Sequence, residues 1–182
     1  MQLATRRLTI RPWQPRDLPA WAGMQADPDV RRYYYPSVLT RAESDAIVEH
    51  CMRHLDEHGF AFLALERRDD SLLIGGAGLS WTHDLPGGPA VEIGWILGRP
   101  FWRQGYASEA SRAWFAHGWS LGLAEIVGYT SVINAPSRAV MEKLGMSRNP
   151  ADDFFDPTVP RDDPLAPHVL YRIRNAGAAK PA

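Results

Sequence analysis

The chain has 182 residues, of which 45% are hydrophobic and 23% charged, and its formal net charge is −1 at pH 7. This composition is that of one globular domain, and it excludes wholesale disorder and fibrous repeats. The near-neutral charge argues against nucleic-acid binding, and no apolar run is long enough for a membrane span, so we expect neither kind of partner.

The N-terminal part of the chain predicts one strand followed by short helices. Leu8, Ile10 and Trp13 are interspersed with polar side chains, which indicates a strand that Pro12 and Pro15 close. Asp17 is placed to cap a short helix that runs through Met24. The Asp-Pro-Asp sequence at 27–29 predicts a further helical turn.

A longer helix is expected next. Thr40 followed by Glu43 has the spacing of a capping box, and Gly59 is a natural end. Apolar side chains recur at helical spacing between these ends: Ile47, Val48, Cys51, Met52 and Leu55.

The centre of the chain predicts three strands and a helix. The strands are expected over residues 60–66, 72–81 and 91–97. A glycine-bearing loop at 98–105 then leads into an amphipathic helix over 106–121.

The C-terminal part adds two strands and one helix. A strand is expected over 125–133, a helix over 136–144 and a last strand over 169–173. An acidic, proline-rich loop at 152–167 separates the last two elements. The order of elements predicts a single mixed α/β domain over 1–182, with a disordered tail at 176–182.

The loop before the helix at 106–121 is the most informative stretch. The first N–H groups of a helix lack partners and carry partial positive charge, so they can hold an anion. Gly105 allows a phosphate to approach the backbone closely, and Arg103 can add charge. The stretch fits neither a Walker loop nor a Rossmann fingerprint, and an ordinary strand-to-helix turn is the alternative.

A second motif, about 30 residues later, starts with Asn134-Ala-Pro-Ser137. Together with Trp102-x-x-Gly105-x-Ala107, it resembles the GNAT superfamily of acyl-CoA-dependent N-acetyltransferases. The stretch Thr5-Arg-Arg-Leu-Thr-Ile-Arg-Pro-Trp13 resembles the opening strand of its ribosomal-protein, or RimJ/RimL-type, branch. The resemblance extends over residues 5–174 and departs from the usual family pattern at Trp102, where Arg or Gln is common.

The resemblance implies a mixed, mostly antiparallel sheet of six or seven strands with helices on both faces. It also implies that the central strands at 91–97 and 125–133 splay apart, that acetyl-CoA is the co-substrate and that no metal is needed. The residues expected to bind acetyl-CoA are Trp95, Ile96, Leu97, Arg103, Gln104, Gly105, Tyr106, Ala107, Ser108, Asn134 and Arg138.

Two side chains are candidates for catalysis. Glu92 lies in an otherwise apolar strand, where burial should raise its pKa toward that of a useful general base. The family often uses a glutamate near this position, sometimes through water, whereas a purely structural glutamate is the alternative. The resemblance makes Ser137 the donor to the departing thiolate, and a helix-capping serine is the alternative.

The implied function is acetyl transfer to a primary amine by direct attack in a ternary complex. The acceptor is either a small amine or a protein N-terminus, and a catalytically silent acyl-CoA-binding module is the alternative. Tyr33, Tyr34 and Tyr35 could line the acceptor pocket, and the five aspartates of Asp152–Asp163 could attract a cation.

Three further expectations concern the whole chain. The N-terminus lacks the apolar core of a signal peptide, and Cys51 is the single cysteine, so we expect a cytoplasmic protein without an internal disulfide. The tryptophans expected at the surface suggest a homodimer. His50, His54 and His58 have a spacing that can hold zinc, but no further ligand is evident, so we favour a solvated helix edge.

Overall fold

The computed structural model describes residues 1–83 and 85–177. The strands are β1 (Leu3–Ala4), β2 (Leu8–Arg11), β3 (Phe62–Arg67), β4 (Leu73–Thr82), β5 (Ala90–Leu97), β6 (Glu125–Ser131), β7 (Ser147–Arg148), β8 (Phe154–Phe155) and β9 (Pro167–Arg174). The helices are α1 (Leu18–Gln25), α2 (Arg41–His58), α3 (Tyr106–Ser120) and α4 (Ala135–Lys143), and three short 3₁₀ turns lie at Pro15–Asp17, Arg99–Phe101 and Pro150–Asp152.

In the described residues, these strands form one nine-stranded sheet in the order β1-β2-β3-β4-β5-β6-β9-β7, with β8 also paired to β9. Six of the strands have four or more residues, in agreement with the six or seven expected. The additional strands β1, β7 and β8 have two residues each, which is too short to show a periodic pattern.

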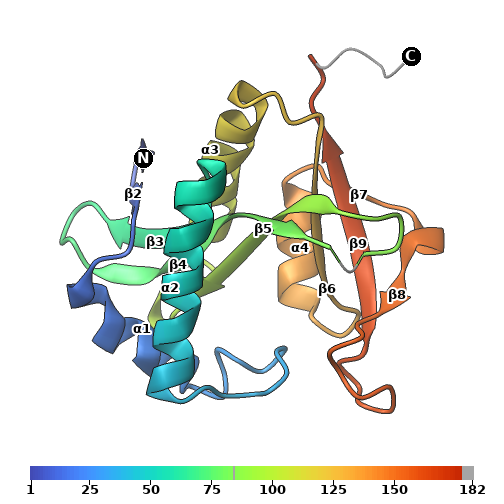
Figure 1. The fold of residues 1–182 in the computed structure, drawn as a ribbon, viewed down its shortest axis with the longest axis horizontal. Helices are drawn as coiled ribbons and strands as arrows, with labels where there is room; N and C mark the ends of the chain where they lie inside the picture. The colour runs from blue at the N-terminus through green and yellow to red at the C-terminus, as the bar shows by residue number, and fades with distance from the viewer. Residues whose placement is uncertain (84, 178–182) are drawn as a thin grey trace.

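Helices cover both faces of the sheet, as expected (Figure 1). Along β3, Leu63 and Leu65 pack into the larger core with α3 and α4. Ala64, between them, packs with Trp21 of α1 and Val48 of α2 on the opposite face.

The sheet splits at its centre. Strands β4 and β5 are antiparallel and pair from Gly75–Leu97 to Thr82–Ala90. Strands β5 and β6 are parallel and pair only at Glu92 and Val127. The predicted splay of the two central strands is therefore confirmed, and it leaves the end of β5 toward Leu97 apart from β6.

The long helix α2 begins and ends as its sequence predicts. Thr40 accepts the backbone N–H of Glu43, whose side chain accepts the N–H of Thr40 in return. Gly59 ends the helix in the left-handed conformation with φ of 77°.

One local prediction in the N-terminal part was wrong. The Asp17 side chain does not cap α1, because its carboxylate binds Arg11 and the Gln14 backbone N–H. The helical turn expected at 27–29 is present, because the Arg31 N–H donates to the Asp27 carbonyl, and residues 28–33 continue as turns without extending into a helix.

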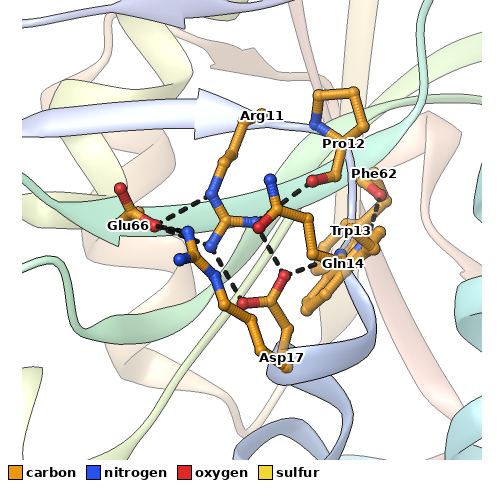
Figure 2. Close-up of polar contacts among 8 residues, drawn as sticks. Arg11, Pro12, Trp13, Gln14, Asp17, Phe62 and Glu66 are labelled. Atoms are coloured by element: carbon orange, nitrogen blue, oxygen red, sulfur yellow. Dashed lines mark hydrogen bonds and ion pairs between the residues drawn. The ribbon is translucent and has the colours of Figure 1, made fainter.

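Arg11 is the centre of a buried ion network that joins β2, β3 and the start of α1 (Figure 2). Its guanidinium lies 2.7 Å from Asp17 Oδ2 and 2.7 Å from Glu66 Oε2. Arg16 also contacts Glu66 Oε2, at 2.9 Å. The network holds β2 and β3 together with the segment that leads into α1.

The C-terminal strand is closed by a bond from Asn175 N–H to the Ala124 carbonyl. Residues 176 and 177 form a turn, and the rest of the tail predicted to be disordered, 178–182, lies outside the described residues. Among the helices that the structure describes, none is both long and apolar enough to cross a membrane.

Candidate active site

A cavity of about 860 Å³ lies at the split between β5 and β6. Its walls come from the segment after α1, from β5 and β6, from the starts of α3 and α4, and from the loop before β9. The residues that line it include Tyr33, Tyr34, Tyr35, Glu92, Trp95, Ile96, Leu97, Trp102, Arg103, Ala107, Tyr129, Asn134, Ser137, Asp156, Thr158 and His168.

The cavity connects the two faces of the sheet. Ile93 packs into the core with α3 and α4, so its neighbour Glu92 projects to the opposite face. Ser137 belongs to α4, on the Ile93 face. Because Glu92 and Ser137 both line the cavity, it runs through the gap between the strands, and two substrates can meet there from opposite sides.

Glu92 has the raised pKa that its sequence surroundings predict. Burial raises the pKa of the Glu92 carboxyl to about 8, with the Tyr129 hydroxyl acting in the opposite direction and Asp156 adding to the rise. In the described part of the chain, no arginine or lysine forms an ion pair with Glu92 or Asp156. The cavity therefore holds a basic carboxyl group without a partner cation.

Two tyrosines share the surroundings of Glu92. The pKa of Tyr34 is raised to about 12, by burial first, with Arg31 opposing and the charge of Glu92 adding to the rise. Burial also raises the pKa of Tyr129, and the nearby Glu92 adds to that effect. Both phenols thus stay protonated at neutral pH and can donate hydrogen bonds.

The start of α3 leaves backbone N–H groups available. Gly105 has φ of 81° and Arg103 φ of 59°, so two residues of the loop have left-handed backbone conformations just before the helix. The first backbone bond of α3 runs from Glu109 N–H to the Gly105 carbonyl, and no described side chain caps the helix. The N–H groups of residues 106–108 therefore lack helical partners and suit an anion.

Trp102 closes the loop onto the strand before it. Its indole N–H donates to the Leu97 carbonyl at 2.7 Å, and the residue is 40% exposed and lines the cavity. The tryptophan thus fixes the loop geometry at the position where the family often has a polar side chain.

Of the residues expected to bind acetyl-CoA, the structure gathers six around the cavity: Trp95, Ile96, Leu97, Arg103, Ala107 and Asn134. The other five do not line it: Gln104, Gly105, Tyr106, Ser108 and Arg138. Tyr106 and Ser108 are buried, so these two offer a ligand only their backbone N–H groups. The Arg138 side chain donates to the Val132 carbonyl at 3.0 Å, which places it under the loop that precedes α4.

Asn134, not Ser137, caps α4. Asn134 Oδ1 accepts the Ser137 backbone N–H at 3.2 Å, and Asn134 Nδ2 donates to Thr130 Oγ1 at 2.8 Å. The capping role considered for Ser137 is therefore taken by Asn134, and Ser137 lines the cavity.

Sequence reasoning missed Tyr129 and His168 in the cavity wall near Glu92, and it included Asp156 only as one of the five aspartates of the acidic loop. Tyr129 lies two positions after Val127, the strand partner of Glu92, and this spacing on the expected strand was an available signal. Asp156 and His168 approach within 3.6 Å, between the carboxylate and the imidazole Nε2. Their meeting depends on the path of the long loop, for which the sequence carries no periodic signal.

The three histidines of α2 do not form a metal site. His54 is buried, and its ring nitrogens contact the Phe60 carbonyl and the Trp81 N–H. Across the described residues, no group of three or more His, Cys, Asp or Glu side chains could hold a metal ion.

Comparisons with known proteins agree on the family. A family model described as an acetyltransferase (GNAT) domain matches residues 7–147. The sequence is 28% identical over 174 residues to the Uncharacterized N-acetyltransferase YnaD of Bacillus subtilis (strain 168), covering 95% of this chain and 96% of that protein. The fold is similar to the crystal structure of a GNAT-family acetyltransferase from Bacillus anthracis, with a TM-score of 0.79, 26% identity and coverage of 96% and 98%.

The microcin C7 self-immunity acetyltransferase MccE, solved in complex with acetyl-CoA and AMP, has a TM-score of 0.76 to this chain over 94% of each. Its identity of 14% shows a shared fold alone.

Proposed function

The chain belongs to the GNAT acetyltransferase family, and we propose that it transfers an acetyl group from acetyl-CoA to a primary amine by direct attack in a ternary complex. The observation that carries this proposal is the single cavity that joins Glu92 on one face of the sheet to Ser137 and the start of α3 on the other. The silent-binding alternative leaves the raised pKa of Glu92 without a role.

The residues present fit acetyl-CoA. The N–H groups at the start of α3 and the Arg103 side chain suit its phosphates, and the separated end of β5, from Trp95 to Leu97, offers a strand edge to its amide-bearing arm. When bound, the thioester supplies the activated acetyl group. A backbone N–H near Ile96 is the candidate donor to the oxyanion.

Glu92 is assigned the general base. An alkyl ammonium cannot attack, so its proton must leave before or during attack. A carboxylate whose pKa is about 8 is basic enough to take that proton directly or through one water. Since only about a tenth of such a group is ionised at pH 7, the rate should rise as the pH approaches 8.

Ser137 is assigned the donor to the departing sulfur. Its backbone N–H is bound to Asn134, which fixes the residue at the first turn of α4, where it lines the cavity. A hydrogen bond from this hydroxyl stabilises the charge that develops on sulfur as the thioester breaks.

The acceptor side favours a cationic amine. Asp156 belongs to the acidic loop, lines the cavity and adds to the negative potential near Glu92. Asp156 Oδ1 is held by the Thr158 N–H and hydroxyl, at 2.8 and 2.6 Å, so the carboxylate has a fixed orientation. Either a small amine or a protein N-terminus, the acceptor of the RimJ/RimL-type branch, satisfies this chemistry. We also propose that the protein is a homodimer and lies in the cytoplasm.

Two measurements test the function. The protein is mixed with acetyl-CoA and a panel of small amines and N-terminal peptides, and a thiol reagent detects release of CoA. We expect release that requires both protein and an amine. CoA binding without release for any amine would favour the silent module.

Calorimetry with CoA tests the phosphate loop. Gly105→Glu should abolish most of the binding, because it adds bulk and negative charge next to the free N–H groups of α3. Gly122→Glu is the matched control, since Gly122 has φ of 83° and lies at the other end of α3, about 24 Å away. Equal affinity of both variants would contradict the placement of the phosphates.

A further inference from the structure

The segment before β2 is attached to the first turn of α3 through Glu109. Glu109 Oε1 accepts the Thr5 hydroxyl at 2.6 Å and the Arg7 backbone N–H at 2.8 Å. Glu109 Oε2 accepts Arg7 Nε at 2.7 Å. Burial would raise the pKa of Glu109, but these bonds and the Arg7 charge hold it below its ordinary value, so the carboxylate is ionised at neutral pH.

The same guanidinium also reaches the loop that precedes α3. Arg7 Nη1 donates to the Gln104 carbonyl at 2.9 Å, and the guanidinium stacks 4.3 Å from the centre of the Tyr106 ring. Arg7 Nη2 lies 3.6 Å from the position that a Cβ on Gly105 would occupy. Arg7 thus contacts Gln104 and Tyr106, the residues on either side of Gly105, and is itself fixed by Glu109.

These contacts determine the orientation of one peptide group. The peptide between Gln104 and Gly105 is trans, so its C=O and N–H point in opposite directions. Because Arg7 holds the Gln104 carbonyl, the Gly105 N–H points away from Arg7. The left-handed Gly105 would otherwise allow this peptide to rotate at low cost.

We propose that Arg7, held by Glu109, is a positioning residue that presets the 103–105 loop for the phosphates of CoA by keeping the Gly105 N–H turned outward. The inference rests on the proposed function, because it assumes that CoA binds at this loop. Arg7 acts by orientation, since its charge is matched by that of Glu109. It lies outside the two motifs that suggest the phosphate site in the sequence.

Binding of two probes tests the proposal: CoA, which carries phosphates, and pantetheine, which carries none. Arg7→Gln and Glu109→Gln should each weaken CoA binding by about tenfold, the effect of losing one charge-assisted hydrogen bond, and leave pantetheine binding unchanged. In turnover, KM for acetyl-CoA should rise while kcat stays near that of the wild type. Thermal unfolding of both variants shows whether they are folded at the assay temperature.

Two further variants separate orientation from charge and from general stability. Arg7→Lys keeps the charge without the planar fork, so it should bind CoA about as weakly as Arg7→Gln. Arg172→Gln removes an arginine of similar exposure that pairs with Glu125 and Asp152, and CoA affinity should not change.

Wild-type affinity of Arg7→Gln for CoA would overturn the proposal, and so would full rescue by Arg7→Lys or an equal loss of pantetheine binding. Failure of the wild-type protein to bind CoA would instead overturn the proposed function.

Discussion

Two enclosed carboxyl groups of this protein have opposite pKa shifts. Burial would raise the pKa of Asp17, but Arg11 and the Gln14 N–H hold it below its ordinary value. Burial raises the pKa of Glu92 to about 8, because the described residues supply it with no ion-pair partner. Asp17 is 2% exposed and sealed in the network of Figure 2, whereas Glu92 faces a cavity.

The comparison separates structural from reactive polar groups. Asp17 has each oxygen bound within the protein, by Arg11 Nη1, Arg11 Nη2 and the Gln14 N–H, so it stabilises the fold and has no capacity left for a ligand. Glu92 retains basicity at a cost in folding free energy when it ionises. A buried carboxyl group therefore indicates chemistry only where its partners are missing.

The largest expected effect is on turnover. Glu92→Gln keeps the size of the side chain and removes its basicity, so the rate at pH 7 should fall by about 10²–10⁴. CoA binding should persist, and part of the rate should return at high pH, where more of the amine is already neutral. A wild-type rate at pH 7 would show that solvent or another residue takes the proton.

The next largest effect is on stability alone. Arg11→Met leaves Asp17 and Glu66 buried without their shared cation, so the free energy of unfolding should fall by about 3–5 kcal/mol. Because the network lies outside the cavity, kcat per folded molecule should not change. Denaturant unfolding and turnover on the same sample check both statements, and a loss of kcat in folded protein would contradict the separation of the two regions.

The two carboxyl groups should also respond to pH with opposite signs. Because the pKa of Glu92 is raised in the folded state, the wild-type protein loses stability as the pH rises and Glu92 ionises. Glu92→Gln does not ionise, so its free energy of unfolding should increase relative to that of the wild type between pH 5 and 9. The lowered pKa of Asp17 contributes stability above about pH 4 that is lost on acidification, so the cost of Asp17→Asn should shrink below pH 4. Thermal melts of the three proteins across this range measure the signs, and parallel profiles for the two variants would refute the contrast.

The smallest effects distinguish two neighbours at the start of α4. Asn134→Ala removes the helix cap and should cost about 1 kcal/mol of stability. Ser137→Ala should leave stability nearly unchanged and lower kcat by about tenfold, since its hydroxyl acts as charge develops on sulfur. If Ser137→Ala loses only stability, the assignment of the two roles is wrong.

The sequence predicted elements wherever local chemistry decides them. The capping box at Thr40, the C-terminal Gly59 and the glycine before α3 each specify a backbone conformation within a few residues, and all three occur. The contacts between residues of the candidate site could be predicted from the sequence only in part. Glu92 and Ser137 could be chosen from their elements, but the meeting of Arg7 with Gln104 joins residues 97 positions apart and has no local signature.

Local patterns also failed where two partners compete for one side chain. Asp17 has the sequence position of a helix cap, yet Arg11 binds its carboxylate more strongly than a backbone N–H would. Asn134 and Ser137 are both good capping residues, and only the folded chain shows which one is used. In each case the outcome depends on a residue that the local pattern does not contain.

The single pairing between β5 and β6 has a consequence for motion. With Glu92 and Val127 as the only matched residues, the two halves of the sheet share little backbone bonding at their junction. Amide hydrogens along β4, paired on both sides, should exchange slowly with solvent, while those at the separated end of β5 should exchange faster. A molecule that pairs with that strand end completes the sheet. Its binding should therefore slow the exchange of backbone amide hydrogens in both β5 and β6.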